Sequence, residues 1–153
     1  MSTNWPTVEL DPITQLRAVQ ASLPGSYLEE RVLDVPFDRL WELVDDLERF
    51  VPMIDPLVRR MEVLSRDGEH VEARTSILKL EGELRRGFMW MQSRPGAGRL
   101  FLVGTAAVPV DDTRTRLAHM EGMRFPGARV LRPCFRRTVR WDLRGIQRLT
   151  ERS

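Results

Sequence analysis

The sequence predicts an α+β fold in which one antiparallel sheet packs against helices. Between residues 57 and 123, apolar residues alternate with polar ones in short runs separated by turns, which indicates a meander of about five strands. Segments 36–50 and 133–153 instead repeat their apolar residues every three to four positions, as amphipathic helices do. Consecutive hairpins form a single antiparallel sheet, and helices segregated to the ends of such a run cover it as a second layer.

The chain is long enough for one domain, preceded by a short arm. It has 153 residues, of which 42% are hydrophobic, a size and composition typical of a globular protein with one core. Prolines and the sequence LPGS punctuate residues 1–26. Within them, Ile13, Leu16, Val19 and Leu23 are spaced as in a helix. We expect a loosely attached arm with a short helix at 1–26 and a folded domain at 27–153.

The first half of the domain begins with a strand over YLEERVLDV (27–35). Pro36 then opens a helix, a position where its missing N–H costs nothing. Prolines 52 and 56 should end helical structure. The apolar stripe of this helix consists of Phe37, Leu40, Trp41, Val44 and Leu47.

The second half alternates strands with turns and closes on a long helix. RDGE joins two strands within residues 57–80, and GELRRGFMWMQSR (82–94) follows as a further strand. The turns PGAG and DDT then flank a strand over RLFLVGTAAVPV, and DDT separates it from the last strand, TRTRLAHMEGM. Pro133 opens the final helix. Its apolar side consists of Phe135, Val139, Leu143, Ile146 and Leu149 or Thr150, and its arginines fall largely on the other side.

Two stretches carry a resemblance to a known superfamily, VLDVPFDRLWELVDDLERFVPMIDPLVRRMEVL (32–64) and FPGARVLRPCFRRTVRWDLRGIQRL (125–149). In the first, a strand runs into a proline-led helix that contains Trp41, with Asp45 after it and the aromatic–proline stretch Phe50 to Pro52. This order resembles the START-related helix-grip (SRPBCC) superfamily, and within it the polyketide cyclase/dehydrase group.

The resemblance covers about residues 27–150 and is one of element order rather than of a catalytic motif. It implies a curved antiparallel sheet wrapped around the long C-terminal helix, with an internal cavity for an apolar or amphipathic small molecule. Members of the superfamily include lipid carriers, aromatic-polyketide cyclases and plain binding proteins. A fold with so many functions does not select among them.

Strand alternation indicates which side chains face that cavity. In TRTRLAHMEGM, Arg114 and Arg116 share one face, and arginines prefer water, so the opposite face with His119 and Glu121 should point inward. A register slip of one residue would reverse this assignment. In residues 82–94 both faces are mixed, so either Leu84, Phe88 and Trp90 or Met89 and Met91 point inward. We favour Phe88 and Trp90, which would bring Arg86 with them.

A histidine beside a carboxylate suits general acid–base chemistry, because its pKa lies near neutrality and the neighbour tunes it. His119 and Glu121 are the predicted acid–base pair for an aldol cyclisation or a dehydration, and Arg86 or Arg31 would stabilise an enolate oxygen. The alternative is a buried pair that only satisfies its own hydrogen bonds. The residues assigned to the wall are Tyr27, Arg31, Val71, Ala73, Thr75, Phe88, Trp90, Leu117, Met123, Val139 and Leu143.

Other classes of function lack their signatures. Two histidines and one cysteine form no recognisable zinc motif, PGAGRL is no phosphate loop, and we expect neither a metal nor another cofactor. Residues 113–153 contain eleven arginines and three acidic residues, which fits a solvated helix face better than a nucleic-acid site. Cys134 is expected to be inert. Both faces of RLFLVGTAAV are apolar, so the arm or a second copy in a homodimer should cover the outer one.

The sequence therefore predicts a helix-grip protein that binds a hydrophobic small molecule, a polyketide or a lipid. The leading function is that of a polyketide cyclase/dehydratase-like biosynthetic protein, and the alternative is a non-catalytic carrier. No stretch reaches the length of a membrane span, no secretory signal is recognisable, and a single cysteine fits a reducing compartment. We expect a cytoplasmic protein.

Overall fold

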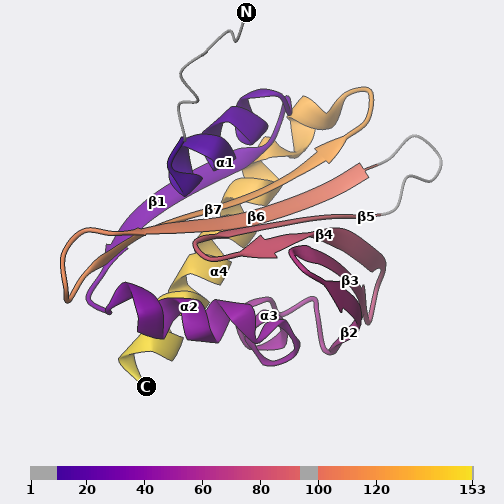
Figure 1. Ribbon diagram of the computed structural model, residues 1–153. Coiled ribbons are helices and arrows are strands. Elements are labelled where there is room, and N and C mark those ends of the chain that lie inside the picture. Colours follow the sequence, from indigo (N-terminus) through magenta and orange to yellow (C-terminus); the bar gives the residue numbers. More distant parts are fainter. Residues whose placement is uncertain (1–9, 94–99, 153) are drawn as a thin grey trace, which may run out of the picture.

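The computed structural model describes residues 10–93 and 100–152, and these form one sheet with helices on both of its faces (Figure 1). The elements, in chain order, are α1 (Pro12–Ala21), β1 (Tyr27–Leu33), α2 (Phe37–Asp45), α3 (Leu47–Ile54), β2 (Met61–Asp67), β3 (His70–Thr75), β4 (Lys79–Arg85), β5 (Phe88–Ser93), β6 (Leu100–Pro109), β7 (Thr115–Arg124), a 3₁₀ turn (Ala128–Leu131) and α4 (Arg132–Glu151).

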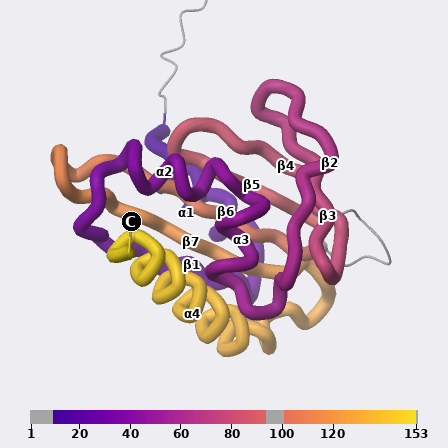
Figure 2. The backbone as a smooth tube through the Cα atoms, turned by 90° about the horizontal axis from the view of Figure 1, so that it is seen from below, coloured from indigo at the N-terminus to yellow at the C-terminus, as the bar shows by residue number. Residues whose placement is uncertain are grey.

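The sheet confirms the predicted α+β helix-grip class. Its seven strands are antiparallel throughout and run in the order β1-β7-β6-β5-β4-β3-β2, so the meander has six strands and β1 joins it beside β7. The sheet curves around α4, and α2 and α3 lie on that same concave side, opposite α1 (Figure 2). No helix of residues 10–93 and 100–152 is long and apolar enough to cross a membrane.

The segment predicted as one strand at 82–94 is instead a hairpin. β4 ends at Arg85, Gly87 takes a left-handed φ of +84° in the turn, and β5 begins at Phe88. Leu84 then pairs directly with Met89 across the hairpin. Directly paired residues share one face of a sheet, so Leu84 and Met89 point into the core together, and the assignment of inward-facing residues for β5 is reversed.

The predicted helix at 36–50 is two helices. The backbone leaves helical geometry at Asp46 (φ −86°, ψ 71°), and α3 then continues through Pro52 to Ile54. Pro52 therefore lies inside a helix, contrary to the expectation that it would end one. The predicted apolar stripe nevertheless holds, since Leu40, Trp41, Val44 and Leu47 are all buried.

Helix α1 packs on the convex face of the sheet. Leu16 is fully buried against β6 and β7, and it lies so close to Gly104 that a Cβ atom there would collide with it. Ala118 and Met120 are buried beneath the same helix. The described part of the arm is thus firmly docked rather than loosely attached, and it provides the cover that the apolar outer face of β6 requires.

Candidate functional site

The concave side of the sheet encloses a cavity of about 320 Å³ against α3 and α4. Most of its lining is apolar and comes from several elements: Leu47, Phe50 and Ile54 on α3, Met61, Leu80, Met89, Met91, Val103 and Met123 on the strands, and Phe135 on α4. Leu57 and Ile77 also line it, yet they are 63% and 62% exposed, which places them at its mouth. The volume lies within the range of small-molecule sites.

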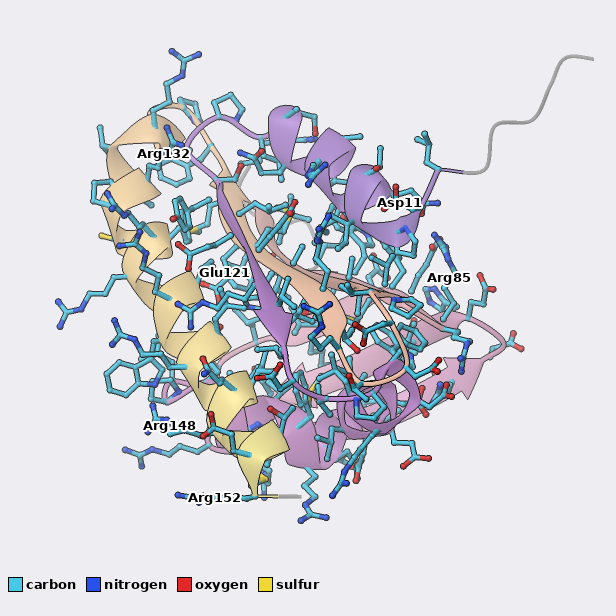
Figure 3. The ribbon with its side chains drawn as sticks, turned by 90° about the vertical axis from the view of Figure 1, so that its left-hand side faces the viewer. Asp11, Arg85, Glu121, Arg132, Arg148 and Arg152 are labelled. Atoms are coloured by element: carbon cyan, nitrogen blue, oxygen red, sulfur yellow. The ribbon has the colours of Figure 1, made fainter. Side chains whose placement is uncertain are left out.

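One wall of this cavity is polar and is built from β7 and α4. Strand alternation directs His119 and Glu121 from β7 toward the helix, and Asp142 meets them from α4. All three side chains are nearly inaccessible to solvent. Figure 3 shows Glu121 in the space between the strands and α4. The inward face predicted for β7 is the one observed.

Hydrogen bonds fix the orientation of the imidazole. His119 Nε2 lies 3.0 Å from Asp142 Oδ2 and 3.8 Å from Glu121 Oε1, while Nδ1 lies 2.8 Å from Thr105 Oγ1. Thr138 on α4 donates its hydroxyl to Glu121 Oε2 at 2.6 Å. We refer to His119, Glu121 and Asp142 as the buried triad. Each of its members has at least one partner, as buried polar groups require.

The three groups shift one another's pKa values. Burial disfavours the imidazolium, but the hydrogen bonds and negative charges of Asp142 and Glu121 outweigh it and raise the pKa of His119 to about 9. Burial, reinforced by Glu121, raises the pKa of Asp142 to about 8, although His119 opposes it. Burial also opposes ionisation of Glu121, yet its hydrogen bonds and His119 lower its pKa. Near neutral pH, the imidazolium and a protonated Asp142 therefore accompany an ionised Glu121.

A fourth acidic group, Asp55, lines the cavity just after α3. Its carboxylate accepts the backbone N–H of Leu57 at 2.8 Å. Burial and the charge of Glu121 raise its pKa, against the hydrogen bond of Leu57. Thr75 and Thr138 add hydroxyl groups to the lining. The polar lining is thus dominated by carboxyl groups.

The buried triad also has the side-chain types of a metal site. One ligand atom from each member falls within 4.8 Å of the others. A tetrahedral zinc ion, however, would hold its ligands roughly 3.4 Å apart, and His119 and Asp142 are at hydrogen-bond distance instead. A second group of three, His70, Glu72 and Glu81, lies on the surface. We therefore describe the triad as a hydrogen-bonded cluster.

The structure brings only some of the predicted wall residues to the cavity. Thr75 and Met123 line it together with His119 and Glu121. Four others are buried in the adjoining core on the same side of the sheet, namely Val71, Ala73, Leu117 and Val139. Leu143 is buried there as well. These five belong to the same hydrophobic core cluster as many of the lining residues but do not line the cavity themselves.

Tyr27 and Arg31 lie on β1, beside the triad rather than in the cavity. The Tyr27 hydroxyl donates to Glu29 Oε1 at 2.8 Å, and Arg31 contacts Glu29 Oε2 at 3.2 Å. Arg140 from α4 donates to the same carboxylate at 3.0 Å. The two arginines are therefore engaged with Glu29, and the predicted stabilisation of an enolate by Arg31 has no support in this arrangement.

Three residues that the sequence assigns to the site lie outside it, because the β4–β5 turn reverses the faces of the strand. Phe88 and Trp90 pack on the convex face beneath α1, and Met89 and Met91 line the cavity in their place. Arg86 lies in the turn itself, where its side chain is 69% exposed and pairs with Asp38. It cannot reach the triad, and its assignment as a catalytic residue is wrong.

Sequence reasoning missed Asp142, although a signal for it exists. It follows Val139 by three residues and precedes Ile146 by four, so it falls on the apolar stripe of α4. An acidic residue in such a stripe is buried and needs a partner. The second missed residue, Thr105, lies on the concave face of β6 and pairs in register with His119.

Comparison with solved structures finds this fold in proteins of low sequence identity. The Zhui aromatase/cyclase from Streptomyces sp. R1128 matches with a TM-score of 0.66 and 17% identity, over 83% of this chain and 93% of that chain. A START superfamily protein from Mycobacterium smegmatis matches with a TM-score of 0.65 and 11% identity, over 83% and 97%. Ara h 8.0201 matches with a TM-score of 0.61 and 12% identity, over 84% and 98%.

No family model and no curated protein matches the chain. At these identities the structural likeness establishes the fold alone. The START-related helix-grip fold that the sequence resemblance predicts is confirmed.

Proposed function

From a helix-grip fold shared with aromatase/cyclases and START proteins, we propose that this chain binds a hydrophobic small molecule in its cavity and acts on it as a polyketide cyclase/dehydratase-like biosynthetic protein. The observation that carries the proposal is the cavity itself, because an apolar chamber of about 320 Å³ ends on one wall of titratable groups. Pockets with few convergent polar groups and perturbed pKa values are typical of active sites. With its single cysteine, the protein fits a cytoplasmic location.

The triad supplies both halves of a dehydration. Glu121, which its hydrogen bonds and His119 keep ionised by lowering its pKa, is the base that removes a proton from the carbon beside a ketone. His119, held as imidazolium, donates a proton to the β-hydroxyl group, which leaves as water while the carbon–carbon double bond forms. Asp142 orients His119 and stabilises its charge through the 3.0 Å contact. An aldol cyclisation uses the same base and the same acid.

The test compares turnover with binding in His119→Gln. The substrate is a synthetic poly-β-ketone thioester, and the aromatic product is followed by absorbance and mass spectrometry. We expect turnover to fall by about 100-fold or more, since general acid–base groups contribute about that much, while the dissociation constant for a non-reactive aromatic ligand changes little. Arg86→Gln is the matched control, because that side chain lies outside the cavity; it should leave turnover and binding unchanged.

The second candidate function is that of a carrier, and one observation favours it. Within the described residues, no buried side-chain nitrogen or oxygen atom lacks a hydrogen-bond partner, so the triad is satisfied as a structural unit. A carrier would bind the aromatic ligand but show no turnover above the uncatalysed rate in the wild type. If the wild type neither turns over the thioester nor binds the ligand, both candidates are wrong.

A further inference from the structure

Acidic groups outnumber basic ones in the described lining of the cavity. Its described lining contains three carboxyl groups, from Asp55, Glu121 and Asp142, and one imidazole, from His119, but neither lysine nor arginine. The imidazole already contacts Asp142 at 3.0 Å and Glu121 at 3.8 Å. The single cationic group of the described lining therefore already has an anionic partner, Glu121.

The arginines nearest this wall are held outside it. Arg31 and Arg140 both contact Glu29, which lies on β1 beside the triad. Arg137 is exposed on α4 and borders a separate, smaller depression that shares Asp55 and Asp142 with the cavity. Because the chain contains 24 lysines and arginines, their absence from the described part of the lining is a distinctive feature of this wall.

This arrangement discriminates among ligands that differ only in their polar group. A carboxylate placed against the triad would lose its hydration, meet the negative charge of Glu121 and find no cation that lacks a counter-ion. A hydroxyl group loses little on desolvation when it donates to Glu121 or Asp55, and an ammonium group gains an opposite charge.

We propose that the cavity takes uncharged or cationic apolar molecules, such as hydroxylated or ketonic chains and hydrophobic amines, and rejects carboxylates. Free fatty acids are therefore excluded as ligands. This inference rests on the proposed function, because it presumes that the cavity binds a hydrophobic molecule, and it narrows the chemical class of that molecule.

The experiment is isothermal titration calorimetry with three probes of identical chain, 1-decanol, decylamine and decanoate, each below its critical micelle concentration. At about pH 8 the acid and the amine are both ionised. We expect decanol and decylamine to bind with dissociation constants at least about tenfold lower than that of decanoate, the scale expected of a partly buried charge interaction.

Variants locate the source of the discrimination. Glu121→Gln and Asp55→Asn each remove a negative charge from the lining, so each should tighten decanoate binding several-fold relative to decanol. Glu83→Gln is the matched control: Glu83 is exposed on β4 and does not line the cavity. It should leave the ratio of the two dissociation constants unchanged.

The outcomes separate this inference from the proposed function. Equal or tighter binding of decanoate in the wild type would overturn the exclusion of carboxylates and leave a hydrophobic site standing. If Glu121→Gln and Asp55→Asn both discriminate against decanoate as strongly as the wild type does, the carboxyl groups of the lining are not the cause. That result would overturn the proposal as argued. Binding of none of the three probes would overturn the proposed function and this inference with it.

Discussion

His119 owes its properties to the two carboxyl groups that face one of its ring nitrogens. Asp142 and Glu121 lie 3.0 Å and 3.8 Å from Nε2, on a wall that solvent does not reach. The hydroxyl group of Thr105, 2.8 Å from Nδ1, fixes the orientation of the ring so that Nε2 faces both carboxyl groups. An imidazole in this setting keeps its proton well above neutral pH, and it is therefore poised as an acid rather than as a base.

Asp142→Asn tests whether the carboxyl group of Asp142 raises the pKa of His119. The substitution removes the nearest negative charge but keeps a hydrogen-bonding oxygen. We expect the pKa of His119 to fall from about 9 by roughly one unit or more. The measurement is an NMR titration of ¹⁵N-labelled imidazoles. A His119 titration that is the same in wild type and variant would show that Asp142 does not stabilise the imidazolium.

At the residue scale, the sequence predicts part of the site. The alternation of Arg114 and Arg116 predicts that His119 and Glu121 lie on the inner face, and the structure agrees. The partner Asp142 is 23 residues further along the chain. Only the path of α4 across the sheet brings it to His119, and periodicity within one helix does not specify that path.

At the scale of elements, one turn decides which residues line the cavity. Residues 82–94 have apolar side chains at both odd and even positions, so the hydrophobic pattern alone does not locate the turn at Gly87. Once the turn is placed, the pairing of Leu84 with Met89 sends the two methionines inward and Phe88 outward. The RDGE and DDT turns needed no such information, because their sequences are typical of hairpins.

Helix α1 should contribute substantially to stability. Leu16 is fully buried between this helix and strands β6 and β7. We expect Leu16→Ala to lower the free energy of unfolding by about 3 kcal/mol, as is typical for a buried leucine. Ala18→Ser, on the exposed side of the same helix, is the control and should cost well under 1 kcal/mol.

Chemical denaturation followed by circular dichroism provides both values. A loss below about 1 kcal/mol for Leu16→Ala would mean that α1 is the loosely attached arm that the sequence suggests, rather than part of the fold.

At the scale of the whole molecule, the triad makes stability depend on pH. His119 has a raised pKa in the folded state, so its contribution is complete below its unfolded value of 6.5 and is lost as pH rises toward about 9. Asp142 keeps its proton up to about pH 8 in the folded state, so its ionisation also opposes folding as pH rises. Both effects have the same sign between pH 6.5 and 8, and that of His119 continues to about pH 9.

We therefore expect the free energy of unfolding to decrease across this window, by on the order of 1–2 kcal/mol. Urea denaturation at several pH values measures the slope. His119→Gln should flatten it, since it removes one of the two titrating groups. A stability that is constant or rises between neutral and alkaline pH would contradict the protonation states assigned to the triad.

The most direct test of the central claim, that the cavity binds an apolar molecule against the triad, uses the methionine methyl groups. Met61, Met89, Met91 and Met123 line the cavity, whereas Met120 is buried under α1 and Met53 is exposed on α3. In a titration of ¹³C-methyl-methionine protein with 1-decanol, the four cavity signals should shift together and saturate, while those of Met120 and Met53 stay in place. Cavity signals that do not move, or a shift confined to Met53, would contradict the account.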